Sequence, residues 1–457
     1  MHNISIFGTS SDAGKSTITF VIAKLLQDMG IKTVPFKAQN VSNNSQVADD
    51  GSEIGISTYF QASVLGVPTS YHLNPILLKS GRKNAASLIV KGKELGEKDV
   101  RSYYKDLDQL KPIVKEAFST LSSQYDCVVA EGAGGCVELN LLEKDLSNTF
   151  IAETFDTKII LVADIEKGGV FASIYGTITL MQEKFRENLI GVVINKFRGD
   201  RTLFDEGIDI IEERFGVPVL GVLPYLPLNL GFEDSASLQN YVQNKDATLK
   251  VGIINLPHMS NFNDFEPLII DEALHVDFIT SNIEAYDFII IPGSKRVVED
   301  LIWLKKSGLF DALRSFKKKI IGICGGYEMM FEKIIDEKGI ESQEKEILGL
   351  GLIKGAVYFQ EKKVLKKTTF HLHDIPLKGY EIHYAISHEH PIYYDGGDCF
   401  GTFVHGIFDN DAFRTYIFTD AYQGYNFQEK KDAILENFIE EMRINLDMRR
   451  VLTCISS

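Results

Sequence analysis

The stretch GTSSDAGKST, residues 8–17, has the form of a phosphate-binding loop with one altered position. In the usual pattern G-x-x-x-x-G-K-[ST], the first glycine lies five residues before the second. Counted back from Gly14 that position is Thr9, and the nearest glycine, Gly8, comes one residue earlier. The stretch follows the apolar run ISIF and precedes an amphipathic segment. It therefore predicts a loop between a strand and a helix over residues 16–29.

A loop of this kind suits a nucleotide polyphosphate, because its backbone N–H groups and the helix N-terminus surround the phosphate oxygens. Lys15 would neutralise the phosphates, and the Ser16 hydroxyl would reach Mg²⁺. A chance Gly-Lys-Ser turn is the alternative, and the flanking strand and helix favour nucleotide binding. The residues expected to bind ATP are Gly8, Thr9, Asp12, Gly14, Lys15, Ser16 and Thr17.

Length and composition narrow the class of protein. A chain of 457 residues exceeds what one core organises, so we expect two domains. No run approaches the roughly 20 apolar residues of a membrane span, and the N-terminus lacks the basic region of a signal peptide. We therefore expect a cytoplasmic protein with no membrane partner. The net charge of −15 disfavours nucleic acid as a partner. Five cysteines without C-x-x-C spacing argue against a disulfide framework or zinc ribbon.

Short apolar runs alternate with amphipathic segments in both halves of the chain, which predicts an α/β fold. The N-terminal half is expected to form a doubly wound parallel sheet, and the second half another α/β domain. Residues 361–390 alternate like antiparallel strands. A change to polar composition marks a linker. The predicted division is an ATP-binding domain at 1–235, a linker at 236–248, and a second domain at 249–457 that ends in helices.

Two carboxylates are candidate Mg²⁺ ligands. Glu131 ends the apolar run CVVAE, where a parallel sheet would bring it near the phosphate loop. Asp50, in VADDGSEIG, is the second candidate, with a solvated turn as its alternative. The stretch FKAQNVSNN is rich in side-chain amides, which suits either a polar ligand pocket or a surface loop. The candidate substrate residues are Gln39, Asn40, Asn43 and Asn44.

In the second half, GICGG at residues 322–326 lies between a predicted strand and a predicted helix. This is the arrangement of a nucleophile elbow with Cys324 in place of serine. Glycines permit the tight turn, and the following helix N-terminus would lower the pKa of the thiol. A buried structural cysteine is the alternative. We expect Cys324 to be a nucleophile.

A thiolate nucleophile needs an imidazole to accept and return its proton. His405 ends the apolar run GTFVHG, so a strand end would aim it, whereas His388 and His390 lie in a polar stretch. Gly325 and Gly293, the latter in IIIPGSK, would supply backbone N–H groups to an oxyanion hole. The other histidines that follow Cys324 are His371, His373 and His383.

Collectively these motifs resemble the cobyric acid synthase family, the glutamine-dependent amidotransferases of cobalamin biosynthesis. The resemblance rests on GTSSDAGKS, PFKAQNVSNN, DGSEIG, LNPILLK, EGAGG, ADIEKGGVFAS, VINKFRGD, IPGSK, GICGGYEM, GYEIH and GTFVHGIF, in the order of the family. The longer phosphate loop is similar to that of dethiobiotin synthetase, which activates a carboxylate with ATP.

The resemblance implies a dethiobiotin-synthetase-like ATPase joined to a class I glutamine-amidotransferase-like domain. It implies ATP and Mg²⁺ as cofactors, and L-glutamine and a corrinoid polycarboxylate as substrates. The family's reaction amidates the b, d, e and g carboxylates of adenosylcobyrinic acid a,c-diamide. Typical class I glutaminases have His-Pro-Glu, but here Gly406 and Ile407 follow His405. A Cys–His dyad is therefore expected.

Two alternatives stay open at this point. Cobyrinic acid a,c-diamide synthase uses the same two domains on other carboxylates, and FKAQNVSNN favours cobyric acid synthase by resemblance alone. The second alternative is a partition-type P-loop switch fused to a glutaminase-like binding domain. Such switches carry KGGxGK[ST], and the loop at residues 8–17 lacks that early lysine. Glutamine hydrolysis would separate an amide synthase from a switch.

Overall fold

The chain divides into two compact units, each described here by itself. The first unit comprises residues 1–42, 48–228 and 432–457, and the second comprises residues 43–47 and 229–431. A computed structural model describes residues 1–80, 85–99, 103, 107–228, 230–231, 241, 244, 247–418 and 422–456. The predicted linker at 236–248 lies outside the described residues, apart from 241, 244, 247 and 248.

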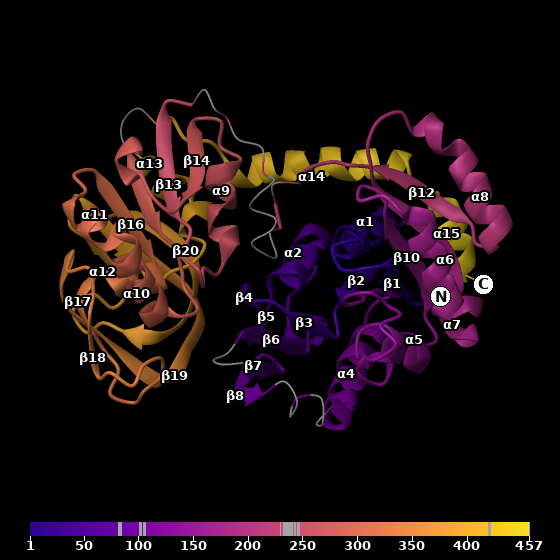
Figure 1. Ribbon diagram of the computed structural model, residues 1–457, viewed down its shortest axis with the longest axis horizontal. Helices are drawn as coiled ribbons and strands as arrows, with labels where there is room; N and C mark the ends of the chain where they lie inside the picture. The colour runs from indigo at the N-terminus through magenta and orange to yellow at the C-terminus, as the bar shows by residue number, and fades with distance from the viewer. Residues whose placement is uncertain are drawn as a thin grey trace. The chain divides into compact units, whose positions relative to one another are not determined.

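The first unit is built on a parallel sheet (Figure 1). Its strands are β1 (Ile4–Gly8), β2 (Thr33–Phe36), β9 (Cys127–Glu131), β10 (Lys158–Asp164), β11 (Leu189–Phe197) and β12 (Val219–Pro224). They lie in the order β12-β11-β10-β1-β9-β2, and every neighbouring pair is parallel. β1 and β9 are buried along their whole length, as expected for central strands covered on both faces. The predicted doubly wound sheet is confirmed.

The remaining elements of the first unit surround this sheet. A smaller sheet has the order β3-β6-β7-β8. Its strands are β3 (Gln39–Val41), β6 (Ile76–Ser80), β7 (Ala85–Val90) and β8 (Lys93–Asp99). The helices and one short strand are α1 (Lys15–Asp28), β5 (Glu53–Gly55), α2 (Ile56–Leu65), α4 (Leu107–Ser122), α5 (Thr149–Phe155), α6 (Val170–Leu180), α7 (Glu183–Glu187), α8 (Asp205–Phe215) and α15 (Met448–Ser456).

The second unit also contains a mainly parallel sheet, with the order β14-β13-β15-β16-β22-β21. Its strands are β13 (Leu249–Ile254), β14 (Leu274–Ile279), β15 (Phe288–Ile291), β16 (Lys319–Ile323), β21 (Tyr393–Asp395) and β22 (Cys399–Thr402). Only the β21–β22 pair in this sheet is antiparallel. Its helices are α9 (Glu266–Ile269), α10 (Val297–Ser307), α11 (Leu309–Ser315), α12 (Gly325–Met330) and α13 (Asp411–Ile417).

A second sheet of this unit has the order β18-β17-β19-β20. Its strands are β17 (Phe331–Ile335), β18 (Glu346–Leu348), β19 (Ile353–Leu372) and β20 (Ile375–Ile386). The long β19–β20 pair is antiparallel, as the alternation of residues 361–390 predicts. The short strand β4 (Ser45–Val47) belongs to this unit as well.

The C-terminal helices differ from the sequence-based division. Helix α14 (Phe427–Ile444) passes from one unit to the other, and residues 432–457 belong to the first unit rather than to the second. Phe438 packs against Phe20, and the Asp447 N–H donates to the Leu220 carbonyl at 2.7 Å. The polar pattern of residues 427–444 predicts a helix but carries no information on which core will cover its apolar side.

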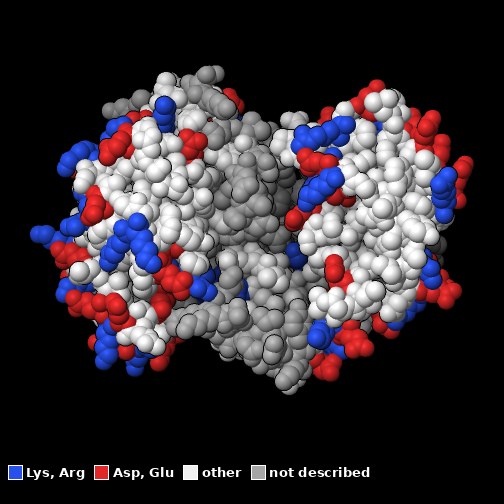
Figure 2. All heavy atoms as spheres, in the orientation of Figure 1, with Lys and Arg blue, Asp and Glu red and all other residues white. Residues whose placement is uncertain are grey.

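Charged side chains of both signs are interspersed over the described residues visible in Figure 2. Within the described ranges, no helix is long and apolar enough to cross a membrane.

Candidate functional site

The phosphate loop connects β1 to α1, as predicted, and its glycines are required by close contacts. A Cβ atom on Gly8 would lie 2.8 Å from the Lys15 Nζ. Gly14 has φ +97°, and a Cβ there would lie 2.0 Å from the Asn195 Nδ2. The Lys15 side chain therefore folds back over Gly8, which explains why the glycine stands at that position rather than at Thr9.

Two residues near the end of β11, Asn195 and Lys196, form hydrogen bonds with the phosphate loop. The Asn195 Nδ2 donates to the Ala13 carbonyl at 2.9 Å, and the Lys196 Nζ donates to the Asp12 carbonyl at 2.6 Å. Lys196 also pairs with Asp164 at 3.0 Å. These contacts fix the backbone of the loop. Both residues lie in VINKFRGD, a motif to which the sequence analysis assigned no role.

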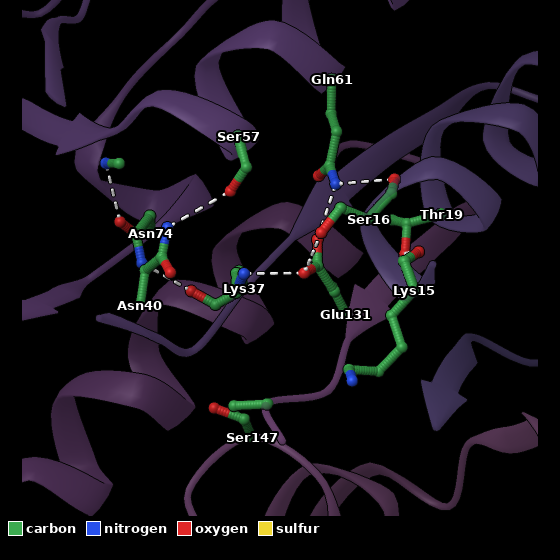
Figure 3. Close-up of polar contacts among 12 residues, drawn as sticks. Lys15, Ser16, Thr19, Lys37, Asn40, Ser57, Gln61, Asn74, Glu131 and Ser147 are labelled. Atoms are coloured by element: carbon green, nitrogen blue, oxygen red, sulfur yellow. Dashed lines mark hydrogen bonds and ion pairs between the residues drawn. The ribbon is translucent and has the colours of Figure 1, made fainter. Parts of the chain in front are cut away.

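Glu131 is the centre of the polar network in Figure 3. Its Oε1 accepts hydrogen bonds from the Ser16 Oγ and the Lys37 Nζ, each at 2.7 Å. Its Oε2 accepts from the Gln61 Nε2 at 2.6 Å. Lys37 follows β2, which is the parallel neighbour of β9, so the carboxyl ends of the two strands bring the ion pair together.

The Lys15 side chain is buried, and burial lowers its pKa. Lys37 lowers the pKa of Lys15 further, whereas Glu131 raises it. The Lys15 Nζ donates to the Ser10 carbonyl at 2.9 Å. Two lysines and one carboxylate thus lie beside the phosphate loop, which favours binding of a more highly charged anion such as a polyphosphate.

The donor set at Glu131 fits Mg²⁺. The Ser16 hydroxyl and a Glu131 carboxylate oxygen are 2.7 Å apart, and oxygen atoms of this kind are the ligands that Mg²⁺ prefers. Asp50 is placed differently. It is exposed, its Oδ1 accepts from the Ser52 N–H at 3.0 Å, and its Oδ2 accepts from the Tyr71 N–H at 3.2 Å. The structure thus shows Asp50 as a turn carboxylate and does not join it to Glu131.

The four candidate substrate amides separate into two groups. The Gln39 Oε1 accepts from the Tyr103 hydroxyl at 2.5 Å, and the Asn40 Nδ2 donates to the Ser57 Oγ at 3.2 Å, both within the first unit. Asn43 and Asn44 instead belong to the second unit.

Cys324 lies at a sharp turn between β16 and α12, with φ +50° and ψ −109°. A Cβ on Gly325 would lie 2.7 Å from the Ser294 backbone nitrogen, and one on Gly326 would lie 1.9 Å from the Ile291 carbonyl oxygen. The two glycines therefore permit close packing against the loop that follows β15. The strained turn has the geometry predicted for a nucleophile elbow.

His405 lies between a thiol and a carboxylate. Its Nδ1 donates to the Asp264 Oδ2 at 2.7 Å, and its ring interacts electrostatically with the Cys324 thiol, which donates to the Ile382 carbonyl at 3.7 Å. Asp264 also accepts from the Gly406 N–H at 2.8 Å. The arrangement is a Cys–His–Asp chain rather than the expected dyad. Asp264 escaped the sequence analysis because it precedes His405 by 141 positions and has no local motif.

Burial and the neighbouring charged groups together determine the pKa values of Cys324 and His405. Burial by itself lowers the pKa of His405, but the Asp264 carboxylate and Cys324 outweigh it and raise the pKa to about 10. Burial raises the pKa of Cys324, and His405 acts in the opposite direction. The pKa of the Cys324 thiol is thus raised by burial and not lowered as predicted. The neighbouring imidazolium is the group that favours the thiolate.

His383 has other partners. Its Nδ1 donates to the Ala385 carbonyl at 2.6 Å, and its Nε2 donates to Glu381 at 3.0 Å. Both ring nitrogens are thus engaged on β20, and neither presents a lone pair to Cys324.

The glycine expected to line the oxyanion hole lies beside the imidazole, since a Cβ on Gly293 would lie 3.0 Å from the His405 Cε1. The Gly293 carbonyl accepts from the Ser260 N–H at 3.0 Å. The next residue, Ser294, donates its hydroxyl to the buried Asp300 at 2.6 Å, which fixes the loop. The Ser294 backbone nitrogen is thereby held near Gly325.

Comparisons with known proteins agree with the folds of the two units. Residues 4–229 match the CobQ/CobB/MinD/ParA nucleotide binding domain, and residues 250–413 match the CobB/CobQ-like glutamine amidotransferase domain. The fold and sites thus define a glutamine amidotransferase that carries its own nucleotide-binding domain.

Full-length relatives narrow this class. The chain is 56% identical to a cobyric acid synthase of Acinetobacter baylyi, with 100% of this chain and 99% of the relative covered. It is 41% identical to one of Listeria monocytogenes (99% and 98% covered) and 38% identical to one of Clostridium acetobutylicum (96% and 94% covered). The chain belongs to the cobyric acid synthase family. It is a glutamine-dependent amide synthase of cobalamin biosynthesis.

Proposed function

We propose that the protein amidates the b, d, e and g carboxylates of adenosylcobyrinic acid a,c-diamide with ATP and glutamine, giving adenosylcobyric acid. The observation that carries this proposal is the full-length identity of 56% to a cobyric acid synthase, together with a phosphate loop and a buried thiol–imidazole pair in one chain.

In the nucleotide-binding unit, Lys15 and the phosphate loop bind the polyphosphate of ATP. Lys37 approaches the same carboxylate as Ser16 and stabilises the negative charge that develops when the substrate carboxylate takes the γ-phosphoryl group. Glu131 and Ser16 would hold Mg²⁺, which would neutralise phosphate charge there. The product of this step is an acyl phosphate.

In the glutaminase unit, the Cys324 thiolate attacks the amide carbon of glutamine. Backbone N–H groups near Gly325 and Gly293 stabilise the oxyanion. The His405 imidazolium gives its proton to the departing ammonia, and Asp264 keeps the ring oriented through Nδ1. Water then releases glutamate from the thioester, with His405 accepting the proton. Ammonia displaces phosphate from the acyl phosphate to form the amide.

Incubation with the a,c-diamide, ATP and glutamine tests the proposal. Mass spectrometry should show four successive products, each with one carboxyl OH replaced by NH₂. Consumption of cobyrinic acid itself, with the a,c-diamide left unchanged, would assign the protein to the earlier amidation. Glutamine hydrolysis without any amidation would contradict both assignments.

A further inference from the structure

The loop that follows β15 passes beside both the nucleophile and the imidazole of the glutaminase unit. A Cβ on Gly325, the residue after Cys324, would lie 2.7 Å from the Ser294 backbone nitrogen. A Cβ on Gly293 would lie 3.0 Å from the His405 Cε1. The backbone of this loop is therefore adjacent to the groups that react, and its position decides which N–H groups reach the carbonyl oxygen of glutamine.

The pairing of this loop determines the direction of the Ser294 N–H. Met259 and Ser294 form an isolated antiparallel bridge. The hydrogen bonds beside this bridge come from the flanking residues, from the Ser260 N–H to the Gly293 carbonyl at 3.0 Å and from the Lys295 N–H to the His258 carbonyl at 2.9 Å. In such a non-hydrogen-bonded pair, the N–H and C=O groups of the two opposed residues point away from each other. The Ser294 N–H is thus turned away from Met259, and Gly325 lies beside the Ser294 nitrogen.

A buried carboxylate, that of Asp300, holds both sides of this bridge. The Ser294 hydroxyl donates to its Oδ2 at 2.6 Å, and the His258 Nδ1 donates to its Oδ1 at 2.8 Å. The His258 backbone N–H donates to the same Oδ1 at 3.3 Å. The Asp300 side chain is fully buried, so these hydrogen bonds replace the water that would surround an exposed carboxylate. Asp300 therefore connects the loop after β15 to the segment with which it pairs.

The helix that carries Asp300 supports this arrangement. Asp300 lies in the first turn of α10, where the helix dipole favours a negative charge. Its N–H donates to the Arg296 carbonyl at 3.0 Å, and the Arg296 N–H donates to the Ser294 hydroxyl oxygen at 3.0 Å. Burial raises the pKa of Asp300, and the hydrogen bonds from Ser294 and His258 act against this shift. The charged form of Asp300 thus depends on the two residues that it positions.

We propose that Asp300 is a positioning residue for glutamine hydrolysis, which holds the Ser294 N–H beside the Gly325 N–H as a second donor to the oxyanion. When the Cys324 sulfur bonds to the amide carbon, the electron pair of the C=O bond moves onto the oxygen. Donors that are already in place stabilise this oxyanion more than they stabilise bound glutamine. Asp300 therefore acts on the rate of this step and leaves glutamine binding and the Cys324–His405 pair unchanged. The inference rests on the proposed function, for which it specifies the oxyanion donors.

The test compares Asp300→Asn and Ser294→Ala with the unmodified full-length protein. Glutamate release is measured against glutamine concentration, with ATP and the a,c-diamide present. The kcat should fall by about 10- to 100-fold in Asp300→Asn, because an amide nitrogen cannot accept a hydrogen bond, and by a smaller factor in Ser294→Ala. The KM for glutamine should change by less than about threefold in both variants. Amidation with ammonium should be unchanged.

Two reagents separate the oxyanion from the other properties of the Cys324 site. Glutamate γ-semialdehyde adds to the thiolate and gives a tetrahedral adduct with its oxygen in the oxyanion position, so its inhibition constant should rise by the factor by which kcat falls. Iodoacetamide alkylates the thiolate with loss of iodide and forms no oxyanion. Its rate of reaction with Cys324, followed by mass spectrometry of the peptide, should stay within about twofold of the unmodified rate. A merely structural role of Asp300 would change both measurements.

Asp311→Asn is the matched control, since Asp311 lies in the first turn of the next helix, α11, and is exposed. It should change none of these quantities. The proposal is overturned if Asp300→Asn and Ser294→Ala keep the full kcat, if they raise the KM alone, if alkylation of Cys324 slows as much as hydrolysis, or if Asp311→Asn has the same effect.

If Asp300→Asn does not fold, Ser294→Ala decides the outcome, because it keeps the buried carboxylate and removes only one hydrogen bond to it. Any of the contrary results, obtained while the unmodified protein amidates the a,c-diamide, overturns the role of Asp300 and leaves the proposed function intact. Glutamate release without any amidation by the unmodified protein would reject the proposed function instead.

Discussion

The candidate site at Glu131 and the candidate site at His405 differ in the arrangement of their polar side chains. In the nucleotide-binding unit, one carboxylate, Glu131, accepts from Ser16, Lys37 and Gln61 at the ends of separate elements. In the glutaminase unit, the His405 imidazole donates to Asp264 through Nδ1 and interacts electrostatically with the Cys324 thiol. The first site is a convergent set of charges, and the second is a linear chain for moving a proton.

The difference explains why the sites respond differently to substitution. A convergent set can exchange one donor for another, so binding a cation or a phosphate requires only a change of partner. A linear chain has no substitute for any member, because each group orients or protonates the next. If ammonia is the only intermediate that the two reactions share, each site should also fail independently of the other.

The largest effect is expected from Cys324→Ser. Glutamine-dependent amidation should fall by about 10⁴-fold or more, because a hydroxyl is a far poorer nucleophile than a thiolate. With ammonium at alkaline pH, the variant should amidate at nearly the unmodified rate. Product formation with each nitrogen source is the measurement. Equal loss with both sources would mean that Cys324 is a core residue and that the sites are not independent.

Lys15→Ala is the converse experiment. Amidation should fall by about 10³-fold with glutamine and with ammonium alike, because no acyl phosphate forms without the lysine at the phosphates. Basal glutamine hydrolysis should persist. Activity that survives with ammonium would show that Lys15 is not the phosphate-binding lysine and would direct attention to Lys37.

Asp264→Asn tests the third member of the linear chain. Glutamine-dependent activity should fall by about 10²- to 10⁴-fold, with ammonium-dependent amidation retained. The Asp264 carboxylate and Cys324 overcome burial to raise the pKa of His405 to about 10, so the imidazolium persists up to that pH. Without the carboxylate the pKa falls, and the alkaline limb of the glutaminase profile should move to lower pH.

The same pKa shift has a consequence for stability. A raised pKa of His405 stabilises the fold fully below its ordinary value of 6.5, and this contribution is lost as the pH rises toward about 10. The melting temperatures of the unmodified protein and Asp264→Asn should therefore differ more at pH 6 than at pH 10. An unchanged pH profile and an unchanged melting difference would leave Asp264 without a role in orienting His405.

Glu131→Gln should weaken the binding of Mg²⁺ at the convergent site, and this effect should be smaller than the preceding ones. The amide keeps an oxygen but loses the charge, so the Mg²⁺ concentration for half-maximal amidation should rise by about 10- to 100-fold. Titration of activity with Mg²⁺ measures this shift. An unchanged requirement in Glu131→Gln, combined with a changed one in Asp50→Asn, would move the metal ligand to Asp50.

The smallest effect on glutamine turnover is expected from His383→Asn. The variant for comparison is His405→Asn. His383 uses both ring nitrogens for Ala385 and Glu381, so its loss should lower the melting temperature and change glutamine turnover by less than about tenfold. His405→Asn should suppress glutamine use far more. A reversal of this order would assign the catalytic base to GYEIH.

The sequence predicts the features whose determinants are local. The phosphate loop at residues 8–17 and the elbow at Cys324 are strand–turn–helix units, and their glycines are close together in the chain. Lys37 lies within FKAQNVSNN, where the side-chain amides are the more conspicuous feature. Lys37 directly follows the buried strand β2, which lies beside β9, the strand that ends in Glu131. A charged residue in this position indicates a place near the site.

Other features depend on contacts between distant residues, which no spacing rule reveals. Asp264 reaches His405 only through the packing of the segment Phe262–Phe265. Local glycine patterns thus indicate the elbow at Cys324 and the phosphate loop, whereas no local pattern marks Asp264.

The division of the chain also has a consequence for the order in which the protein forms during synthesis. Residues 432–456 complete the first unit, where the His2 N–H donates to the Ile455 carbonyl and Leu446 pairs with Gly221. A ribosome delivers these residues only after the glutaminase unit has been made. Domains usually fold from the N-terminus onward during translation. The nucleotide-binding unit emerges first, but its fold includes residues 432–456. We therefore expect it to complete its folding after the glutaminase unit.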